Sequence, residues 1–136
     1  MTIGDPDLLD AYDVIVLGAG AGGMAAAIVA ANEGLNTLVL EKTTYVGGTT
    51  SVSGGMVWAP NNAKMAACGL SDSMEDAQTY LESTVGRGAG AELRAVFLRE
   101  ASNAIDYFDC NTHVHLAPLP FYPDYYPDEP GATLGG

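Results

Sequence analysis

A glycine-rich turn between an apolar run and an alanine-rich segment constrains the fold of this chain most strongly. Gly18, Gly20 and Gly23 fit the pattern G-x-G-x-x-G. Residues 12–17 before the turn form a compact, β-branched run that is typical of a buried parallel strand. Residues 24–33 after it are almost entirely alanine, isoleucine and valine, which predicts a buried helix. The first glycine permits a tight turn, and the second allows the backbone to approach a pyrophosphate. The third allows the helix to pack closely on the strand.

A second predicted strand, residues 37–41, extends this turn into a right-handed βαβ unit of a Rossmann-like α/β fold. Glu41 ends the strand 21 residues after Gly20. A carboxylate at this place accepts hydrogen bonds from both ribose hydroxyls of an adenosine and repels a 2′-phosphate. The phosphates would lie on the free amides at the start of the helix. The residues predicted to bind the dinucleotide are Gly18, Ala19, Gly20, Ala21, Gly22, Gly23, Glu41 and Lys42.

A second pair of glycines favours FAD over NAD as the dinucleotide. Gly47 and Gly48 follow Glu41 after a few residues, an arrangement found in flavoproteins with two dinucleotide-binding sites. FAD extends beyond the first phosphate site, so its flavin side needs a second close approach of the backbone. NAD-dependent dehydrogenases do not usually have this second loop.

The acidic composition excludes several classes of partner. The chain has 17 Asp+Glu against 5 Lys+Arg, a net charge of −12, which disfavours nucleic acid and anionic membrane surfaces. Its sequence contains no run close to the ~20 apolar residues of a membrane span. Acidic residues near the N-terminus replace the basic ones of a secretory signal, and Cys68 and Cys110 lack CxxC or metal-type spacing. We therefore expect a cytoplasmic protein.

Only two strands are predicted in 136 residues, fewer than a doubly wound domain needs to cover its first helix. We interpret the chain as an incomplete folding unit, either a piece of a longer protein or part of a heteromer whose second chain completes the sheet. An acidic leader is expected at 1–11, and 12–136 is interpreted as the N-terminal portion of an FAD-binding domain. Its predicted parts after the βαβ unit are a flavin loop at 47–62, helices at 73–86 and 91–109, and a Pro/Tyr-rich active-site loop at 116–136.

The flavin loop carries a resemblance to a known family. It reads Gly47-Gly-Thr-Thr-Ser-Val-Ser-Gly-Gly-Met-Val-Trp-Ala-Pro-Asn-Asn62 and is similar to the corresponding loop of 3-ketosteroid Δ1-dehydrogenases. These enzymes belong to the succinate dehydrogenase/fumarate reductase flavoprotein superfamily. Residues 72–86, the 91–109 helix and Tyr122-Pro-Asp-Tyr-Tyr-Pro127 resemble the same family, so nearly all of 12–136 is covered.

The resemblance implies a second set of FAD contacts in this loop. Small residues are required there, because larger side chains would keep backbone donors away from the flavin ring. No histidine lies within 42–60 to carry a covalent link, so the FAD is expected to be non-covalent. The residues implied are Gly48, Thr49, Thr50, Ser53, Gly54, Gly55 and Met56.

The resemblance also implies a reaction, the desaturation of a cyclic ketone and specifically 1,2-dehydrogenation of a 3-ketosteroid. In that family a tyrosinate removes the α-proton, hydride passes to flavin N5, and a further tyrosine supports the base. We place this supporting tyrosine at Tyr125, with Tyr126 as the alternative, and expect Phe121 and Tyr122 to line the substrate. Aromatic packing of a proline-rich loop is an equally weighted interpretation. The main base is expected outside this chain.

Other interpretations remain open. The chain could belong to another member of the superfamily, acting on a smaller cyclic ketone or reducing an activated alkene, or be a non-catalytic FAD-carrying subunit of a split flavoenzyme. No cysteine lies between Glu41 and Asn62, which argues against the disulfide reductases. No carboxylate or thiol is suitably placed near His113 and His115 to complete a metal site, so both are predicted to be surface loop residues rather than metal ligands.

Overall fold

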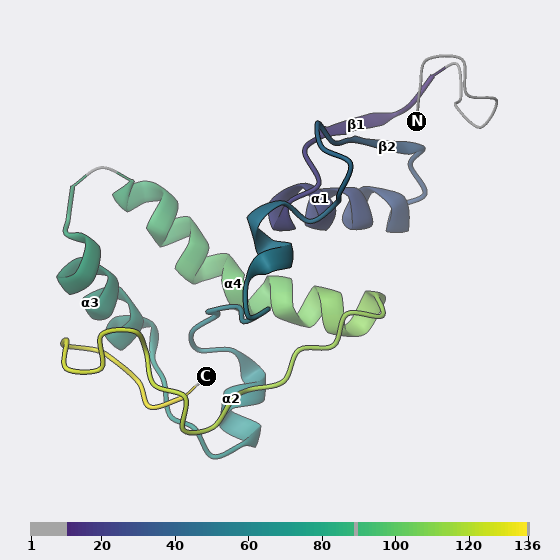
Figure 1. Ribbon diagram of the computed structural model, residues 1–136. Helices are drawn as coiled ribbons and strands as arrows, with labels where there is room; N and C mark the ends of the chain where they lie inside the picture. Colours follow the sequence, from purple (N-terminus) through teal and green to yellow (C-terminus); the bar gives the residue numbers. More distant parts are fainter. Residues whose placement is uncertain (1–10, 89, 136) are drawn as a thin grey trace. The chain divides into compact units, whose positions relative to one another are not determined.

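A computed structural model describes residues 11–135, residue 89 excepted (Figure 1). The expected acidic leader, apart from its last residue, therefore lies outside the described residues. The chain divides into two compact units, Met1–Met56 and Val57–Gly136.

The first unit is the predicted βαβ arrangement. Strand β1 (Val14–Leu17) is followed by helix α1 (Ala21–Asn32) and strand β2 (Thr37–Leu40), and the strands pair in parallel from Val14 opposite Thr37 to Leu17 opposite Leu40. The helix begins three residues before the predicted range. Its first turn holds two glycines, which the apolar pattern could not mark. A short 3-10 helix, η1 (Gly48–Val52), lies in what was expected to be an irregular loop.

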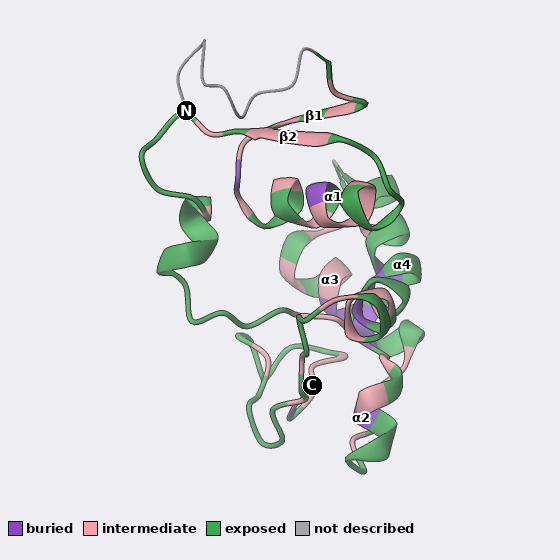
Figure 2. Ribbon diagram, turned by 90° about the vertical axis from the view of Figure 1, so that its right-hand side faces the viewer, coloured by how far each residue is buried: buried purple, intermediate pink, exposed green. Residues whose placement is uncertain are grey.

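One face of the two-stranded sheet is apolar and exposed. Val16 lies on the side of α1, because its Cγ1 would be 3.3 Å from a Cβ built on Gly23. Side chains alternate across a strand, so Ile15 and Leu17 lie on the opposite face, where they are 57% and 80% exposed. Figure 2 shows helix α1 on one side of the two strands. The prediction of a small α/β fragment with an incompletely covered sheet is therefore confirmed.

The second unit is helical. Its long helices are α3 (Met74–Val85) and α4 (Ala91–Asn111), both close to their predicted ranges. A five-residue helix, α2 (Ala63–Ala67), was not predicted; it begins where the Asn62 side chain accepts a 3.1 Å hydrogen bond from the Lys64 N–H. An aromatic cluster joins the parts of this unit, since the Trp58 ring lies 5.8 Å from the rings of both Tyr80 and Phe97.

Helix α3 begins at a side-chain cap, Ser73. Ser73 Oγ accepts a 3.0 Å hydrogen bond from the Asp76 N–H and donates a 2.7 Å bond to Asp76 Oδ2. In a capping box the acidic side chain three residues after the cap accepts a hydrogen bond from the N–H of the cap residue. Here the Ser73 N–H donates to Asp72 instead. The aspartate in place of glutamate or glutamine is one methylene shorter, which accounts for the difference. Among the helices described between residues 11 and 135, none has the length and apolarity to cross a membrane.

Candidate cofactor site and tyrosine loop

The glycine-rich turn has the geometry that its glycines were expected to allow. Gly18 has a φ of +97° and donates a 2.7 Å hydrogen bond to the Leu40 carbonyl of the neighbouring strand. A Cβ built on Gly23 would lie only 1.9 Å from the Gly18 carbonyl oxygen. The strand and the helix therefore approach so closely at this turn that no side chain fits at position 23.

The start of α1 leaves its amides and its surface open. Gly20 is the N-cap residue, and no side chain caps the helix. The first intrahelical bond joins the Met24 N–H to the Gly20 carbonyl, so the amides of Ala21, Gly22 and Gly23 have no partner within the helix. A Cβ built on Gly20 or Gly22 would point into open space. Main-chain donors and the positive end of the helix dipole thus face a surface free of side chains.

The second glycine pair packs directly on this turn. The Gly47 N–H donates a 2.8 Å hydrogen bond to the Ala19 carbonyl, and a Cβ on Gly48 would lie 3.2 Å from Gly20 Cα. Gly47 and Gly48 both have positive φ, at +110° and +56°. The two loops that the sequence indicated separately therefore form one continuous backbone surface within the first unit.

Glu41 joins the end of β2 to the turn. Its Oε2 accepts a 2.9 Å hydrogen bond from the Ala19 N–H, and its Oε1 accepts from the Thr43 N–H and hydroxyl at 3.0 and 3.1 Å. The Ala19 N–H, and after it Thr43, holds the pKa of the Glu41 carboxyl below its ordinary value. Each carboxylate oxygen has two lone pairs, so acceptor capacity remains for a ligand. The contribution of Thr43 was not foreseen from the sequence.

The other residues expected around the cofactor lie on the surface of the first unit. All of them are exposed. Hydroxyls inside the loop brace its backbone, since Ser53 Oγ donates to the Thr50 carbonyl at 2.8 Å and accepts from the Gly55 N–H at 3.1 Å. These exposed residues are Lys42, Thr49, Thr50, Ser53, Gly54, Gly55 and Met56.

The Pro/Tyr-rich segment forms a closed loop, which we call the tyrosine loop (residues 119–135). Asp124 joins its two limbs: its N–H donates to the Thr133 carbonyl at 3.1 Å, and its Oδ2 accepts from the Thr133 N–H at 2.9 Å. Tyr125 and Tyr126 are 87% and 61% exposed, and Phe121 and Tyr122 are exposed as well. The aromatic side chains therefore do not fill the interior of the second unit.

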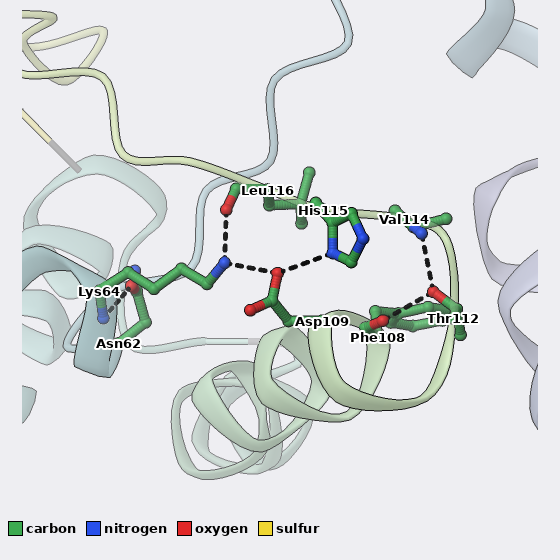
Figure 3. A network of polar contacts seen from close by, with 8 residues as sticks. All are labelled: Asn62, Lys64, Phe108, Asp109, Thr112, Val114, His115 and Leu116. Atoms are coloured by element: carbon green, nitrogen blue, oxygen red, sulfur yellow. Dashed lines mark hydrogen bonds and ion pairs between the residues drawn. The ribbon is translucent and has the colours of Figure 1, made fainter.

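A polar network anchors the chain between α4 and the tyrosine loop (Figure 3). Lys64 Nζ lies 2.6 Å from Asp109 Oδ1 and donates a 2.7 Å hydrogen bond to the Leu116 carbonyl. The same Asp109 oxygen is 3.2 Å from His115 Nδ1. Helix α4 and the segment after it thus bring one carboxylate, Asp109, alongside His115, a pairing that the sequence pattern did not mark. Among the described residues no group of three His, Cys, Asp or Glu side chains could hold a metal ion.

Replacing Lys64 by methionine should lower the Tm of the protein in a pH-dependent way. Lys64 is the main cause that lowers the pKa of Asp109 below its ordinary 3.8, followed by His115. Because the pKa of Asp109 is lower in the folded state than in the unfolded state, the ionised carboxylate stabilises the fold above pH ~3.8. This stabilisation is lost as the pH falls through the pKa of the folded state. The Tm difference should therefore be largest near neutral pH and shrink in acid. Arg99→Met, which breaks an exposed pair with Glu100, is the control and should change Tm little. Equal losses at every pH would contradict the expectation.

Comparison with known proteins shows the family to which the chain belongs. The profile of a family described as FAD binding domain matches residues 13–131. The chain belongs to this family. Its cofactor is FAD. The structure fits this assignment, because an FAD-binding domain needs open amides at a helix start and a backbone cradle without side chains, and the first unit provides both.

Relatives of this FAD-binding domain include ketone dehydrogenases. The 3-oxosteroid 1-dehydrogenase of Mycobacterium tuberculosis is 42% identical over 92% of this chain, and the 4-oxocyclohex-2-ene-1-carboxylate 5-dehydrogenase of Sinomonas cyclohexanicum is 44% identical over 93%. The crystal structure of 3-ketosteroid Δ1-dehydrogenase from Sterolibacterium denitrificans, in complex with 1,4-androstadiene-3,17-dione, matches 92% of the chain with a TM-score of 0.78 and 46% identity. The chain spans only 21–22% of the length of these proteins. The resemblance found in the sequence is thus confirmed.

Proposed function

We propose that this chain is the FAD-binding part of a flavoenzyme that desaturates a cyclic ketone, with a 3-ketosteroid as the preferred substrate class. The observation that carries the proposal is the 46% identity to a 3-ketosteroid Δ1-dehydrogenase over 92% of the chain. This likeness extends far beyond the βαβ unit that all such nucleotide-binding folds share. Because the match covers 92% of the chain and leaves at most 8% uncovered, the likeness reaches into the tyrosine loop, which a cofactor carrier without chemistry would not need.

A smaller cyclic ketone is the second candidate substrate. The relative that acts on 4-oxocyclohex-2-ene-1-carboxylate is 44% identical to the chain, compared with 42% for the 3-oxosteroid 1-dehydrogenase. Sequence identities this similar do not distinguish a substrate with one ring from a steroid with four rings. Both names describe a ketone on a six-carbon ring, so the ring ketone is the part of the substrate that the proposal fixes most firmly.

We assign the FAD contacts to the turn, to Glu41 and Lys42, and to the small residues of the flavin loop. Bound non-covalently, the cofactor would supply the acceptor for a hydride. The absence of histidine from 42–60 supports non-covalent binding. The proton is proposed to leave through a tyrosine base outside this chain, supported by Tyr125 or, alternatively, Tyr126. A tyrosine has an ordinary pKa of ~10, so its phenolate needs such hydrogen-bonding support. Phe121 and Tyr122 would line the substrate.

The rest of the enzyme is proposed to be supplied by further sequence or by a second chain. The share of the relatives that the chain covers, about 22%, supports this proposal, as does the exposed apolar face of the sheet. A cytoplasmic location is supported by Cys68 and Cys110, which are free and exposed thiols.

Anaerobic bleaching of the flavin tests the proposed function. The chain is produced together with its completing part, and the flavin absorbance is recorded before and after addition of a 3-ketosteroid or of 4-oxocyclohex-2-ene-1-carboxylate. Bleaching by the steroid supports the leading substrate, and bleaching by the small ring alone would replace it. Flavin that neither ketone bleaches would leave the chain as an FAD carrier or as part of an enzyme of another reaction.

Replacing Tyr125 by phenylalanine should slow turnover by up to about 10²-fold, because the tyrosine base that it supports would lose the hydrogen bond that favours its phenolate, and should leave the flavin spectrum intact. The exposed hydroxyl of Tyr125 is removed while the backbone of the tyrosine loop stays held by Asp124 and Thr133. Turnover and spectrum are measured on the same preparation, with Tyr126→Phe alongside. A larger loss in the Tyr126 variant would exchange the two roles, and loss of flavin would contradict the placement of this loop.

A further inference from the structure

We propose that Tyr80 of α3 is a positioning residue, whose phenol oxygen holds the tyrosine loop where its chemistry requires it. This inference rests on the proposed function, because the exposed tyrosines act on a substrate only there. The Tyr80 side chain is 7% exposed, and its hydroxyl oxygen accepts a 3.1 Å hydrogen bond from the backbone N–H of Tyr126. The two residues are 46 positions apart in the sequence. Figure 1 shows the loop, in yellow, beside α3.

Tyr80 is itself held firmly, so it can act as a fixed support. Its ring packs on Trp58 with an interplanar angle of 50°, and Trp58 stacks on Phe97 of α4 at 15°. Its carbonyl accepts hydrogen bonds from the hydroxyls of Ser83 and Thr84 at 3.1 and 2.7 Å. A buried aromatic side chain has few rotatable bonds, so the position of its hydroxyl is defined by this packing.

The returning limb of the tyrosine loop meets the same turn of α3. Gly131 has a φ of +80°, and a Cβ built on it would lie 2.2 Å from the Asp76 carbonyl oxygen and 2.8 Å from the Tyr80 nitrogen. The loop is thus docked at two points, through the Tyr126 amide and through Gly131. Asp124 ties these two limbs together.

Docking through the backbone explains how Tyr125 and Tyr126 can stay exposed and still be held in place. Their rings contribute little burial, at 87% and 61% exposed, so their positions depend on the loop. Displacement of a reacting group by as little as 1 Å can cost about 10²-fold in rate. The Tyr80 hydroxyl is therefore expected to affect the chemical step, with little effect on FAD or on ground-state substrate binding.

The substitution Tyr80→Phe tests this role in the assembled, flavin-loaded enzyme. Phenylalanine keeps the ring against Trp58 and removes only the acceptor. We expect kcat for the 3-ketosteroid to fall about tenfold, equivalent to one lost neutral hydrogen bond, with KM and flavin content unchanged. Tyr107→Phe, which removes a hydroxyl from α4, is the matched control and should leave kcat unchanged. An unchanged kcat in Tyr80→Phe would overturn the proposal.

Hydrogen exchange provides a readout that does not depend on activity. Peptides covering 122–130 should exchange faster in Tyr80→Phe and not in Tyr107→Phe. A wild-type enzyme inert toward ketones contradicts the proposed function, whereas unchanged exchange in Tyr80→Phe contradicts the docking role itself. A lower kcat with unchanged exchange would also overturn the proposal, because the hydroxyl would then act by another route.

A double variant separates positioning from general loss of stability. Gly131→Ala pushes the other limb off α3, since its Cβ has no room beside the Asp76 carbonyl. If both substitutions act on one docked loop, the kcat loss of the double variant should be smaller than the product of the two single losses. A multiplicative loss would mean that Tyr80 and Gly131 act separately and would overturn the shared docking.

Discussion

Replacing Gly23 by alanine is expected to weaken FAD binding strongly by disrupting the turn itself. The added Cβ would lie 1.9 Å from the Gly18 carbonyl oxygen and 3.1 Å from its carbonyl carbon, and both are backbone atoms that cannot rotate away. Strand β1 and helix α1 would have to separate. Overpacking of this severity costs on the order of 3 kcal/mol, which corresponds to about 100-fold weaker binding of any ligand that requires the native turn. Flavin absorbance relative to protein absorbance, measured after gel filtration of the assembled protein, checks the expectation.

Two further glycines provide controls for this experiment. Gly88→Ala adds the same methyl group in open space between α3 and α4 and should leave flavin content unchanged. Gly22→Ala also adds it in open space, but on the surface where the cofactor is expected, so it should weaken FAD without lowering the Tm of the FAD-free protein. Full flavin content in Gly23→Ala would mean that the turn in solution is wider than the structure indicates.

Replacing Glu41 by glutamine has the second largest expected effect. Both carboxylate oxygens accept hydrogen bonds from donors, Oε2 from the Ala19 N–H and Oε1 from Thr43. A glutamine amide has only one oxygen, so its NH₂ group must face one of these donors. The variant should bind FAD roughly tenfold more weakly or worse, because both the turn and the ribose contact lose a charged acceptor. Titration of the FAD-free protein with FAD, followed by flavin fluorescence, measures the change.

The role of Glu41 also predicts that FAD is released more readily in acid. The pKa of Glu41 is lowered from 4.5, so its hydrogen bonds are fully present above pH ~4.5 and are lost as the pH falls through the folded value. Wild-type protein should therefore release FAD more readily below pH ~4.5, and the glutamine variant should lack this acid step. Glu33→Gln, an exposed acid at the end of α1, is the matched control. An acid step of equal size in the Glu41 variant would assign the titration to another group.

The elements that the sequence predicted are those with a repeating pattern over ten or more residues or a motif with a strict backbone requirement. The βαβ unit, α3 and α4 belong to this class. The short helices α2 and η1 were missed, because five residues provide less than two turns of periodicity and each is held by local side-chain bonds such as that of Asn62.

Contacts between residues far apart in the sequence also could not be predicted from sequence patterns. The packing of Gly48 on Gly20, the shared contacts of Asp109, and the bond from Tyr126 to Tyr80 each depend on how the chain folds back on itself. The motif identified Glu41 as a ligand for ribose, a role that stays a prediction. It could not reveal that the same carboxylate braces the turn, since Thr43 carries no pattern that marks it.

The uncovered side of the β1–β2 pair has a consequence for how this polypeptide behaves during biosynthesis. Ile15 and Leu17 present branched aliphatic surface to water on a sheet of only two strands, a size that is marginal without further support. A chain with this face uncovered should therefore associate with other copies or with chaperones. If the rest of the enzyme covers the face, as proposed above, producing the chain together with it should keep the chain out of inclusion bodies, and the yield in the soluble fraction measures this effect.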